Sequence, residues 1–242
     1  MTKRVIFIEH DNASPGGPIW AQFERRGFEI VRFMVVGAEN AENPNVEPVW
    51  PDFFKFDAVV VMGAQYAAYD DARIGNWLLP LIEKMRAVHN AGIPVFGICF
   101  GGQLMSRVLG GTVSRSPRAE LGWVDIKSKD ESFVSNGPWF QFHWDRFTLP
   151  PGATEIASNE LCPQAFVYGR TLGVQFHPEV DPEVLDTWLA IESACADLES
   201  EGVEVENLRA QTRKIQSESN KRGYELVDQF LDRVATAPIV LI

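Results

Sequence analysis

A cysteine between two glycines is the clearest candidate for chemistry in this sequence. Cys99 is the centre of residues 97–101 (GICFG), which follow a short apolar run and precede a helix predicted over 103–109. A strand that turns sharply into a helix at a nucleophile is the geometry of a nucleophile elbow. The turn strains the backbone, so its neighbours need little bulk, and Gly97 and Gly101 meet that need. A buried, inert cysteine is the simpler alternative, but the glycine pair and the strand-to-helix switch favour a thiolate nucleophile.

A thiolate that attacks an amide needs a proton-transfer partner and a group that orients this partner. His177 and Glu179 form the best such pair in the sequence. They lie two residues apart at the end of an apolar strand predicted over 172–176, so their side chains share one face. Pro178 ends the strand, which puts both side chains where a strand enters a loop, a common place for catalytic groups.

The other three histidines have different interpretations. His89 lies late in a predicted helix, which suits a capping or surface role. His10 follows the first predicted strand, within reach of the site, but a polar loop histidine is the favoured interpretation. His143 belongs to residues 142–145 (FHWD), a block that gains meaning only from a family comparison.

An acyl-transfer site also needs donors for the developing oxyanion. Two backbone N–H groups are predicted for this purpose, those of Phe100 and Ala64. Phe100 follows the cysteine directly. Ala64 lies in the loop after the third predicted strand, and neighbouring parallel strands bring such loops together at the carboxyl edge of a sheet.

The elements around these residues alternate between strands and helices in the first half of the chain. Strands are predicted over 4–8, 28–36 and 58–62, with a helix ending at Gly27 and another over about 74–91. This alternation predicts an α/β fold with a mainly parallel central sheet, flanked by helices joined in right-handed crossovers.

The second half has a different pattern. Residues 112–175 show short strand-like runs and no convincing helix, which predicts a smaller antiparallel sheet. Residues 183–235 have amphipathic helical spacing, which is broken at Gly202, and Gly223 is a second candidate for a break. With no repeats and no obvious linker, we expect one domain over 1–242, with a core over about 4–182 and a helical extension over 183–242.

Composition restricts the kinds of molecule that the chain is expected to bind. The formal net charge is −11 and the pI about 4.9, which argues against nucleic acid as the partner. No segment has the length of a membrane span, and the apolar run near the N-terminus is too short for a signal peptide. The three cysteines are widely spaced without a metal-binding pattern, so we expect no metal, no cofactor and a reducing cytoplasmic location.

Three separated blocks resemble the class I, triad-type glutamine amidotransferases. They are residues 97–103 (GICFGGQ), 142–145 (FHWD) and 173–179 (GVQFHPE). The likeness is greatest to the amidotransferase domain of GMP synthases and their stand-alone relatives, and it spans roughly residues 4–182. It implies a flavodoxin-like class I glutamine amidotransferase fold.

The resemblance also implies a role for each matching residue. Cys99 would attack the γ-carbonyl carbon of a glutamine-like substrate, His177 would transfer the proton, and Glu179 would orient His177. A γ-glutamyl thioester would form and be hydrolysed to glutamate. The implied substrate contacts are Gly63, Gln103, the main chain around His143 and Trp144, and the Asp145 carboxylate at the α-amino group.

Three features depart from the family pattern. Ala64 and Gln65 stand where many members have glycine and proline, so the Ala64 N–H can serve only if its φ is negative. Trp144 replaces a small residue and is expected to alter which γ-substituent fits. After residue 182 the chain has helices instead of an ATP-pyrophosphatase domain, and it contains no glycine-rich phosphate loop.

The expected activity is cysteine-dependent hydrolysis of a small-molecule γ-glutamyl amide. Either the chain supplies ammonia from glutamine to a separate synthetase, or it acts alone on a γ-glutamyl amine or peptide. The missing ATP-pyrophosphatase domain and the altered loop at Ala64 and Gln65 favour the second version. A non-catalytic regulatory protein that kept the fold is an alternative of a different class, against which the intact residues Cys99, His177 and Glu179 argue. A peptidase-like or isomerase-like relative would lack the block over 175–179.

Overall fold

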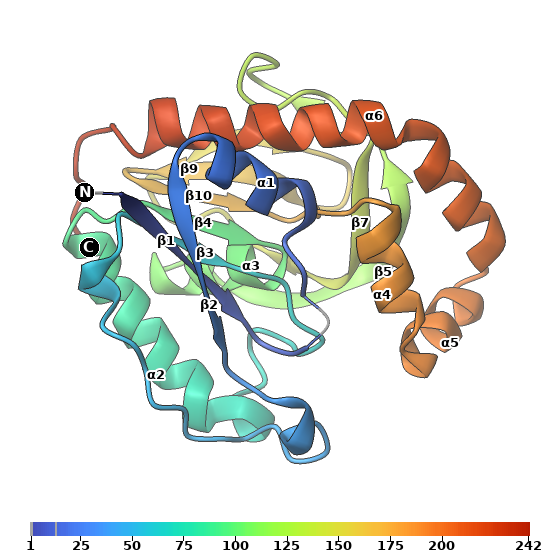
Figure 1. The fold of residues 1–242 in the computed structure, drawn as a ribbon, viewed down its shortest axis with the longest axis horizontal. Coiled ribbons are helices and arrows are strands. Elements are labelled where there is room, and N and C mark those ends of the chain that lie inside the picture. Colours follow the sequence, from blue (N-terminus) through green and yellow to red (C-terminus); the bar gives the residue numbers. More distant parts are fainter. Residues whose placement is uncertain (1, 13) are drawn as a thin grey trace.

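Two β-sheets and six α-helices make up the computed structural model, which describes residues 2–12 and 14–242 (Figure 1). The larger sheet contains, in spatial order, β2 (Phe28–Met34), β1 (Lys3–Glu9), β3 (Ala58–Val61), β4 (Val95–Ile98), β10 (Thr171–Val174), β9 (Pro163–Tyr168), β8 (Thr154–Ser158) and β6 (Lys127–Ser128). The first five strands run parallel, and β9, β8 and β6 continue the sheet in antiparallel pairs. A separate antiparallel pair consists of β5 (Val113–Val124) and β7 (Trp139–Phe147).

The parallel half follows from continuous apolar runs. Residues 5–8 and 58–61 are fully buried, as expected for strands covered on both faces. An α-helix follows three of these strands: α1 (Gly17–Arg25) follows β1, α2 (Asp71–Asn90) follows β3, and α3 (Phe100–Val108) follows β4. The connection from β2 to β3 is a loop with two short 3-10 turns. The predicted alternation of strands and helices is confirmed.

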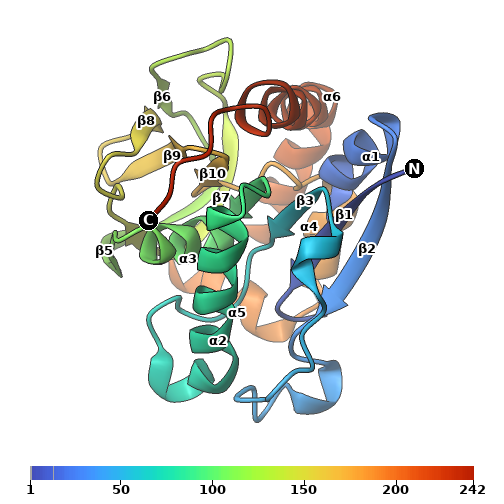
Figure 2. The same ribbon diagram turned by 90° about the vertical axis from the view of Figure 1, so that its left-hand side faces the viewer.

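Helices cover both faces of the larger sheet, as the two views together show (Figure 2). On one face, α1 and the long helix α6 (Val205–Gln229) pack against side chains such as Phe7 and Phe96. On the other face, α2 and α3 pack against Ile8 and Val61. The strand β4, which leads to Cys99, is therefore held between two apolar layers.

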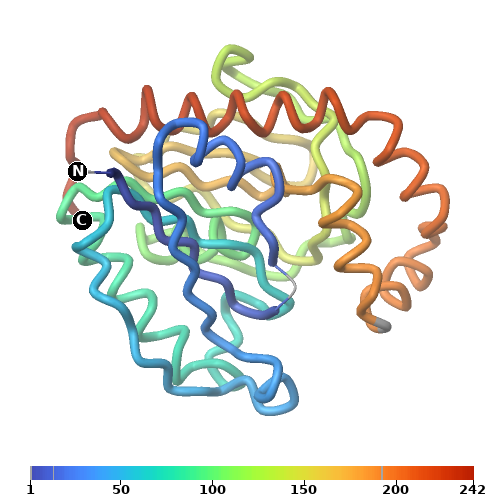
Figure 3. The backbone as a smooth tube through the Cα atoms, in the orientation of Figure 1, coloured from blue at the N-terminus to red at the C-terminus, as the bar shows by residue number. Residues whose placement is uncertain are grey.

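The segment after residue 181 forms the predicted helical extension. It contains α4 (Pro182–Leu189), α5 (Glu192–Ser200), α6 and a π-helical turn, η3 (Phe230–Val234). The tube in Figure 3 leaves the sheet along α4 and α5 and then returns across the molecule as α6. Leu185, Leu198 and Leu208 pack with Phe140 of β7 in a third apolar cluster, which attaches the extension to the smaller sheet.

The two glycines of the extension behave differently. Gly202 lies between α5 and α6 with φ +77°, so the predicted break there is confirmed. Gly223 lies within α6, and the helix continues through it. A Cβ at this position would lie 2.8 Å from the carbonyl oxygen of Pro178, so glycine is needed here because the helix packs closely against that main chain.

The antiparallel region has no helix, as predicted, but its strands are longer than the sequence indicated. The run predicted over 122–126 is the end of the twelve-residue β5, and those over 140–142 and 146–149 belong largely to one strand, β7. Polar residues interrupt the apolar pattern in the middle of both strands. Their side chains face buried polar partners, and a hydrophobic pattern carries no signal for such contacts.

Candidate active site

Cys99 lies at the sharp turn between β4 and α3. Its backbone has φ +50° and ψ −106°, the only positive φ of a non-glycine residue in the described parts of the chain. Such a conformation costs about 1–3 kcal/mol and persists only where its surroundings fix it. Because α3 begins at Phe100, Cys99 occupies the helix N-cap, where the helix dipole favours negative charge. The backbone thus has the geometry predicted for a nucleophile elbow.

Close packing explains the glycines of the elbow. A Cβ on Gly97 would lie 2.4 Å from the carbonyl oxygen of Gly101, and one on Gly101 would lie 2.0 Å from that of Val61. A Cβ on Gly102 would lie 2.3 Å from the carbonyl oxygen of Val174. Helix α3 therefore starts directly against β3 and β10, which holds Cys99 at the carboxyl edge of the sheet.

His177 and Glu179 form a buried pair beyond the end of β10. The Nδ1 atom of His177 lies 2.7 Å from Oε1 of Glu179, and both side chains are almost wholly buried. The backbone N–H of His177 donates to the carbonyl oxygen of Phe140 at 2.8 Å, which ties the pair to β7. The tautomer with a proton on Nδ1 is the one that donates to the carboxylate.

The His177 ring also interacts with Cys99. Burial disfavours the charged ring, but the negative charges of Cys99 and Glu179 outweigh it and raise the pKa of His177 to about 10. A Cβ on Gly63 would lie 3.1 Å from Cε1 of His177 and 3.9 Å from Cβ of Cys99, so the glycine leaves room where the two side chains approach. The Trp188 indole packs against the imidazole at 4.9 Å between centroids.

The two residues predicted to supply oxyanion donors line a cavity together with Cys99. Phe100 is the first residue of α3, so its N–H lies outside the intrahelical hydrogen-bond ladder. Ala64 follows Gly63 in the loop after β3 and lines the cavities at Cys99. Its φ is not positive, since Cys99 alone has that property among the described non-glycine residues, so Ala64 meets the condition set by its departure from the family pattern.

Two cavities meet at Cys99. The polar cavity contains Tyr69, Arg73, Gln103, Arg115, Trp144 and Asp145. The apolar cavity contains Phe142, His177, Trp188, Ile191, Ser193 and Ala194. Phe142, Ala64 and Asp197 border both. Cys99 thus borders both a polar and an apolar cavity.

A family model described as "Glutamine amidotransferase class-I" matches residues 32–194. The chain belongs to the class I glutamine amidotransferases. The family resemblance and the fold class expected from the sequence are therefore confirmed, and a cysteine nucleophile is a feature of this family.

Relatives of this amidotransferase include two GMP synthases described as glutamine-hydrolyzing. The one from Aeropyrum pernix is 39% identical over 125 residues, covering 46% of this chain and 24% of the relative. The one from Azoarcus sp. (strain BH72) is 32% identical over 145 residues, covering 52% and 26%. The matched region thus spans about a quarter of the length of these curated relatives.

Solved structures support the fold of this amidotransferase. A glutamine amidotransferase from Thermotoga maritima superposes with a TM-score of 0.81 at 23% identity, covering 96% of this chain and 99% of that one. A glutamine amido transferase from Methylobacillus flagellatus gives 0.77 at 21% identity, with coverage of 96% and 95%. At these identities the likeness concerns the fold alone.

Four of the predicted substrate contacts line the polar cavity, namely Gln103, His143, Trp144 and Asp145, whereas Gly63 lines the apolar one. Tyr69 Oη donates to Oδ1 of Asp145 at 3.0 Å, and the Arg115 guanidinium lies 3.9 Å from the same oxygen. Burial raises the pKa of Asp145 against the lowering effects of Tyr69 and Arg115. The His143 side chain is buried and makes its hydrogen bonds within the protein.

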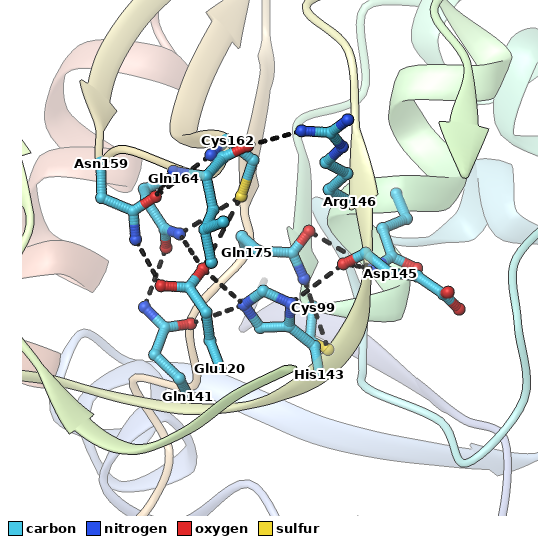
Figure 4. Close-up of polar contacts among 12 residues, drawn as sticks. Cys99, Glu120, Gln141, His143, Asp145, Arg146, Asn159, Cys162, Gln164 and Gln175 are labelled. Carbon is cyan, nitrogen blue, oxygen red and sulfur yellow. Dashed lines mark hydrogen bonds and ion pairs between the residues drawn. The ribbon is translucent and has the colours of Figure 1, made fainter. Parts of the chain in front are cut away.

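A chain of two amide groups links the sulfur to this cavity, and its first member, Gln175, lies beside Cys99 in Figure 4. Gln175 Nε2 donates to Sγ of Cys99 at 3.8 Å, and its Oε1 accepts from Gln103 Nε2 at 3.3 Å. Gln103 Nε2 also donates to the carbonyl oxygen of Asp145 at 3.2 Å. The sequence analysis missed the role of Gln175, although its place two residues before His177 on the same strand face was a usable signal.

Glu120 is a second residue that the sequence analysis missed. Its Oε2 lies 3.3 Å from Nε2 of His143 and accepts from Gln164 at 3.0 Å, while its Oε1 accepts from Asn159 at 2.5 Å (Figure 4). Burial opposes the charge of Glu120, but the hydrogen bond and charge of His143 and the amide donors lower its pKa. His143 Nδ1 lies 2.9 Å from the carbonyl oxygen of Asp145, so Glu120 holds the wall of the polar cavity indirectly. No local sequence pattern connects these distant residues.

Two other histidines differ from expectation. His10 is fully buried, packs on Phe100 at 4.6 Å between centroids, and its Nδ1 lies 3.2 Å from the carbonyl oxygen of Gly63. Burial lowers its pKa to about 4, so it is a neutral core residue and not a polar loop residue. His89 is also buried, 2.8 Å from Oγ1 of Thr171, so the capping or surface interpretation was wrong. Helix α2 packs its last turn against the sheet, which helical position alone does not reveal.

The described residues offer no obvious metal centre and no membrane span. Nowhere in residues 2–12 and 14–242 do three or more His, Cys, Asp or Glu side chains gather as they would around a metal ion. Nor does a helix in these ranges have the length and apolarity needed to cross a membrane.

Proposed function

We propose that this amidotransferase hydrolyses the amide bond of a γ-glutamyl substrate through a thioester on Cys99. The observation that carries the proposal is the buried His177–Glu179 pair beside the strained Cys99. The charges of this group raise the pKa of His177 to about 10, so at neutral pH the ring holds the proton that a leaving amine needs. Membership of the class I family supports the same reaction type.

In the proposed reaction the Cys99 thiolate attacks the γ-carbonyl carbon, and the carbonyl electrons move to oxygen. The N–H groups of Ala64 and Phe100 stabilise this charge. His177 transfers its proton from Nε2 to the amide nitrogen as the C–N bond breaks, which leaves a γ-glutamyl thioester. The neutral ring then takes a proton from water as the water oxygen attacks the thioester. The C–S bond breaks, glutamate leaves, and the charged Cys99–His177 pair is restored.

We assign the glutamyl portion to the polar cavity. Its Asp145 carboxylate is placed for the α-ammonium group, and Gln103 faces the same space. The guanidinium groups of Arg73 and Arg115, with main chain at His143 and Trp144, supply positive charge and donors for the α-carboxylate. Cys99 borders this cavity, so a γ-carbonyl carbon held there lies within its reach. Gly63 leaves the space in which the tetrahedral centre forms.

Covalent labelling with a diazo ketone analogue of glutamine tests this proposal. Mass spectrometry is expected to find the label on Cys99, with labelling and amide turnover both lost in Cys99→Ser. Cys162→Ser is the matched control, because burial and the charge of Glu120 raise the pKa of the Cys162 thiol to about 12 and keep it unreactive. An unlabelled Cys99 in folded protein would instead support a regulatory protein without catalysis.

A second candidate function is the supply of ammonia to a separate synthetase. The specific observation in its favour is that the curated relatives are GMP synthases named as glutamine-hydrolyzing. This version predicts that glutamine is the preferred substrate and that a synthetase protein stimulates its turnover. A reaction on N-substituted amides with little turnover of glutamine would exclude it.

We also propose that residues 1–242 act as one domain. Helix α6 packs along α1 of the core, and Gly223 in α6 contacts the main chain of Pro178, next to His177. The Gln22 amide and the Arg26 guanidinium donate to Asp228 of α6, at 2.8 and 2.7 Å. Limited proteolysis tests this: a stable core that loses residues 183–242 and keeps its activity would contradict it.

A further inference from the structure

The helical extension builds a wall of the active site. Trp188 comes from α4, Ile191 from the N-cap of α5, and Ser193 and Ala194 from its first turn. Together with Phe142 of β7, they line the apolar cavity beside Cys99. The glutamyl portion of a substrate has its partners in the polar cavity, so this second space is left for another part of the substrate.

The position of the acid–base pair indicates which part. His177 and Glu179 line the apolar cavity and do not line the polar one. The atom that receives a proton from His177 is the amide nitrogen of the leaving amine. This nitrogen, and any substituent that it carries, therefore lies on the apolar side of Cys99.

The charge of the apolar cavity restricts that substituent. None of its described lining residues is a lysine or an arginine, whereas Asp11, Glu179 and Asp197 contribute carboxylates. The Asp11 carboxylate is fixed near the cavity by Ser14 Oγ at 3.1 Å and the Gln65 N–H at 3.4 Å. A leaving group with its own carboxylate would meet like charge, and the one cation among the described lining residues, the protonated His177 ring, is already paired with Glu179. The aromatic and aliphatic walls suit an apolar body, which gains from burial.

We propose that the apolar cavity binds the amine portion of an N-substituted γ-glutamyl amide, and that this amine has an apolar body and no carboxylate. The inference rests on the proposed hydrolysis through Cys99 and names its substrate class. It separates γ-glutamyl amines, which fit, from γ-glutamyl peptides, whose amino-acid leaving group does not. It also gives the extension a function, since without α4 and α5 the cavity has no wall on that side.

Wild-type protein tests the inference with three amides that share the γ-glutamyl group. They are γ-glutamylbenzylamide, γ-glutamylglycine and glutamine itself. We expect kcat/KM for the benzylamide to exceed that for γ-glutamylglycine at least about tenfold, the minimum effect of fitting an extra apolar group to a pocket. We also expect it to exceed that for glutamine.

A filled cavity gives a second test. Ala194→Phe places a ring in the apolar cavity, so the ratio of kcat/KM for benzylamide over glutamine is expected to fall about tenfold. Ala196→Phe is the matched control, because Ala196 is exposed on the same helix and does not line the cavity. Its ratio is expected to stay at the wild-type value.

The outcomes separate this inference from the proposed function. If glutamine is turned over and Cys99 is labelled, but γ-glutamylglycine equals or exceeds the benzylamide, the inference is wrong and the thioester mechanism stands. If Cys99 is not labelled and no amide is cleaved, the proposed function is wrong, and the inference that rests on it is wrong as well. The wild-type comparison decides even if Ala194→Phe does not fold.

Discussion

The side-chain amide of Gln175 donates a hydrogen bond to the sulfur of Cys99, with Nε2 and Sγ 3.8 Å apart. Its oxygen accepts from Gln103, which in turn donates to the main chain of Asp145. A chain of hydrogen bonds therefore connects the nucleophile to Asp145 in the wall of the proposed substrate cavity.

Gln175→Leu removes this donor while keeping a similar volume. A hydrogen bond to a charged group contributes about 1.5–3 kcal/mol, so kcat/KM is expected to fall about ten- to hundredfold. The rate of Cys99 alkylation by iodoacetamide at pH 7, followed by mass spectrometry, should fall as well. Gln211→Leu, on the exposed face of α6, serves as the control. An unchanged alkylation rate would show that the amide does not stabilise the thiolate.

Glu179→Gln is expected to lower kcat by on the order of a hundredfold or more. The charge of Glu179 helps to raise the pKa of His177, so its removal lowers that pKa. Because His177 must carry a proton to release the amine, the alkaline limb of the pH–kcat profile should move to lower pH. Glu183→Gln, exposed in the first turn of α4, should leave the profile unchanged. An alkaline limb that stays in place would contradict the pairing.

His10 makes stability depend on pH. Its pKa is lowered to about 4 by burial, below the ordinary value of 6.5, so the unfolded chain binds a proton more readily than the folded one. The contribution of His10 to the free energy of unfolding should therefore be largest above pH 6.5 and decrease as the pH falls towards 4, by about 1.4 kcal/mol per unit of pKa difference. His89, whose pKa burial also lowers, adds in the same direction. In urea unfolding between pH 7 and 4, His10→Gln should show a smaller decrease than wild type.

Gly101→Ala tests the packing of the elbow. Its Cβ would lie 2.0 Å from the carbonyl oxygen of Val61, which forces α3 away from β3. Overpacking of this kind costs about 1–3 kcal/mol, measured by chemical denaturation, and the displaced Cys99 should lose most of its activity. Gly75→Ala is the matched control within α2, where the nearest atom is 3.9 Å away and alanine should stabilise the helix by about 0.5–1 kcal/mol. Equal effects at the two positions would rule out a special role for the elbow contact.

The sequence predicted the parallel half of the fold because its strands are continuous apolar runs separated by helical spacing. The pairing of residues 177 and 179 was also visible, since two residues after a strand share one face. Strand β5 was predicted only at its end, and β7 was predicted as two strands, because Glu120 and His143 break the apolar pattern and their partners lie far away in the chain. The placement of Trp188 and Ile191 beside Cys99 depends on how α4 and α5 pack, which periodicity does not contain.

The positive φ of Cys99 makes the activity depend on intact tertiary packing. That conformation is unfavourable for a cysteine and is maintained by the contacts of α3 with β3 and β10. If those contacts loosen, the residue relaxes to an ordinary conformation even while the helices remain intact. Enzymatic turnover therefore requires ordered tertiary packing. On warming, turnover should be lost at a lower temperature than the helical signal in the far-ultraviolet.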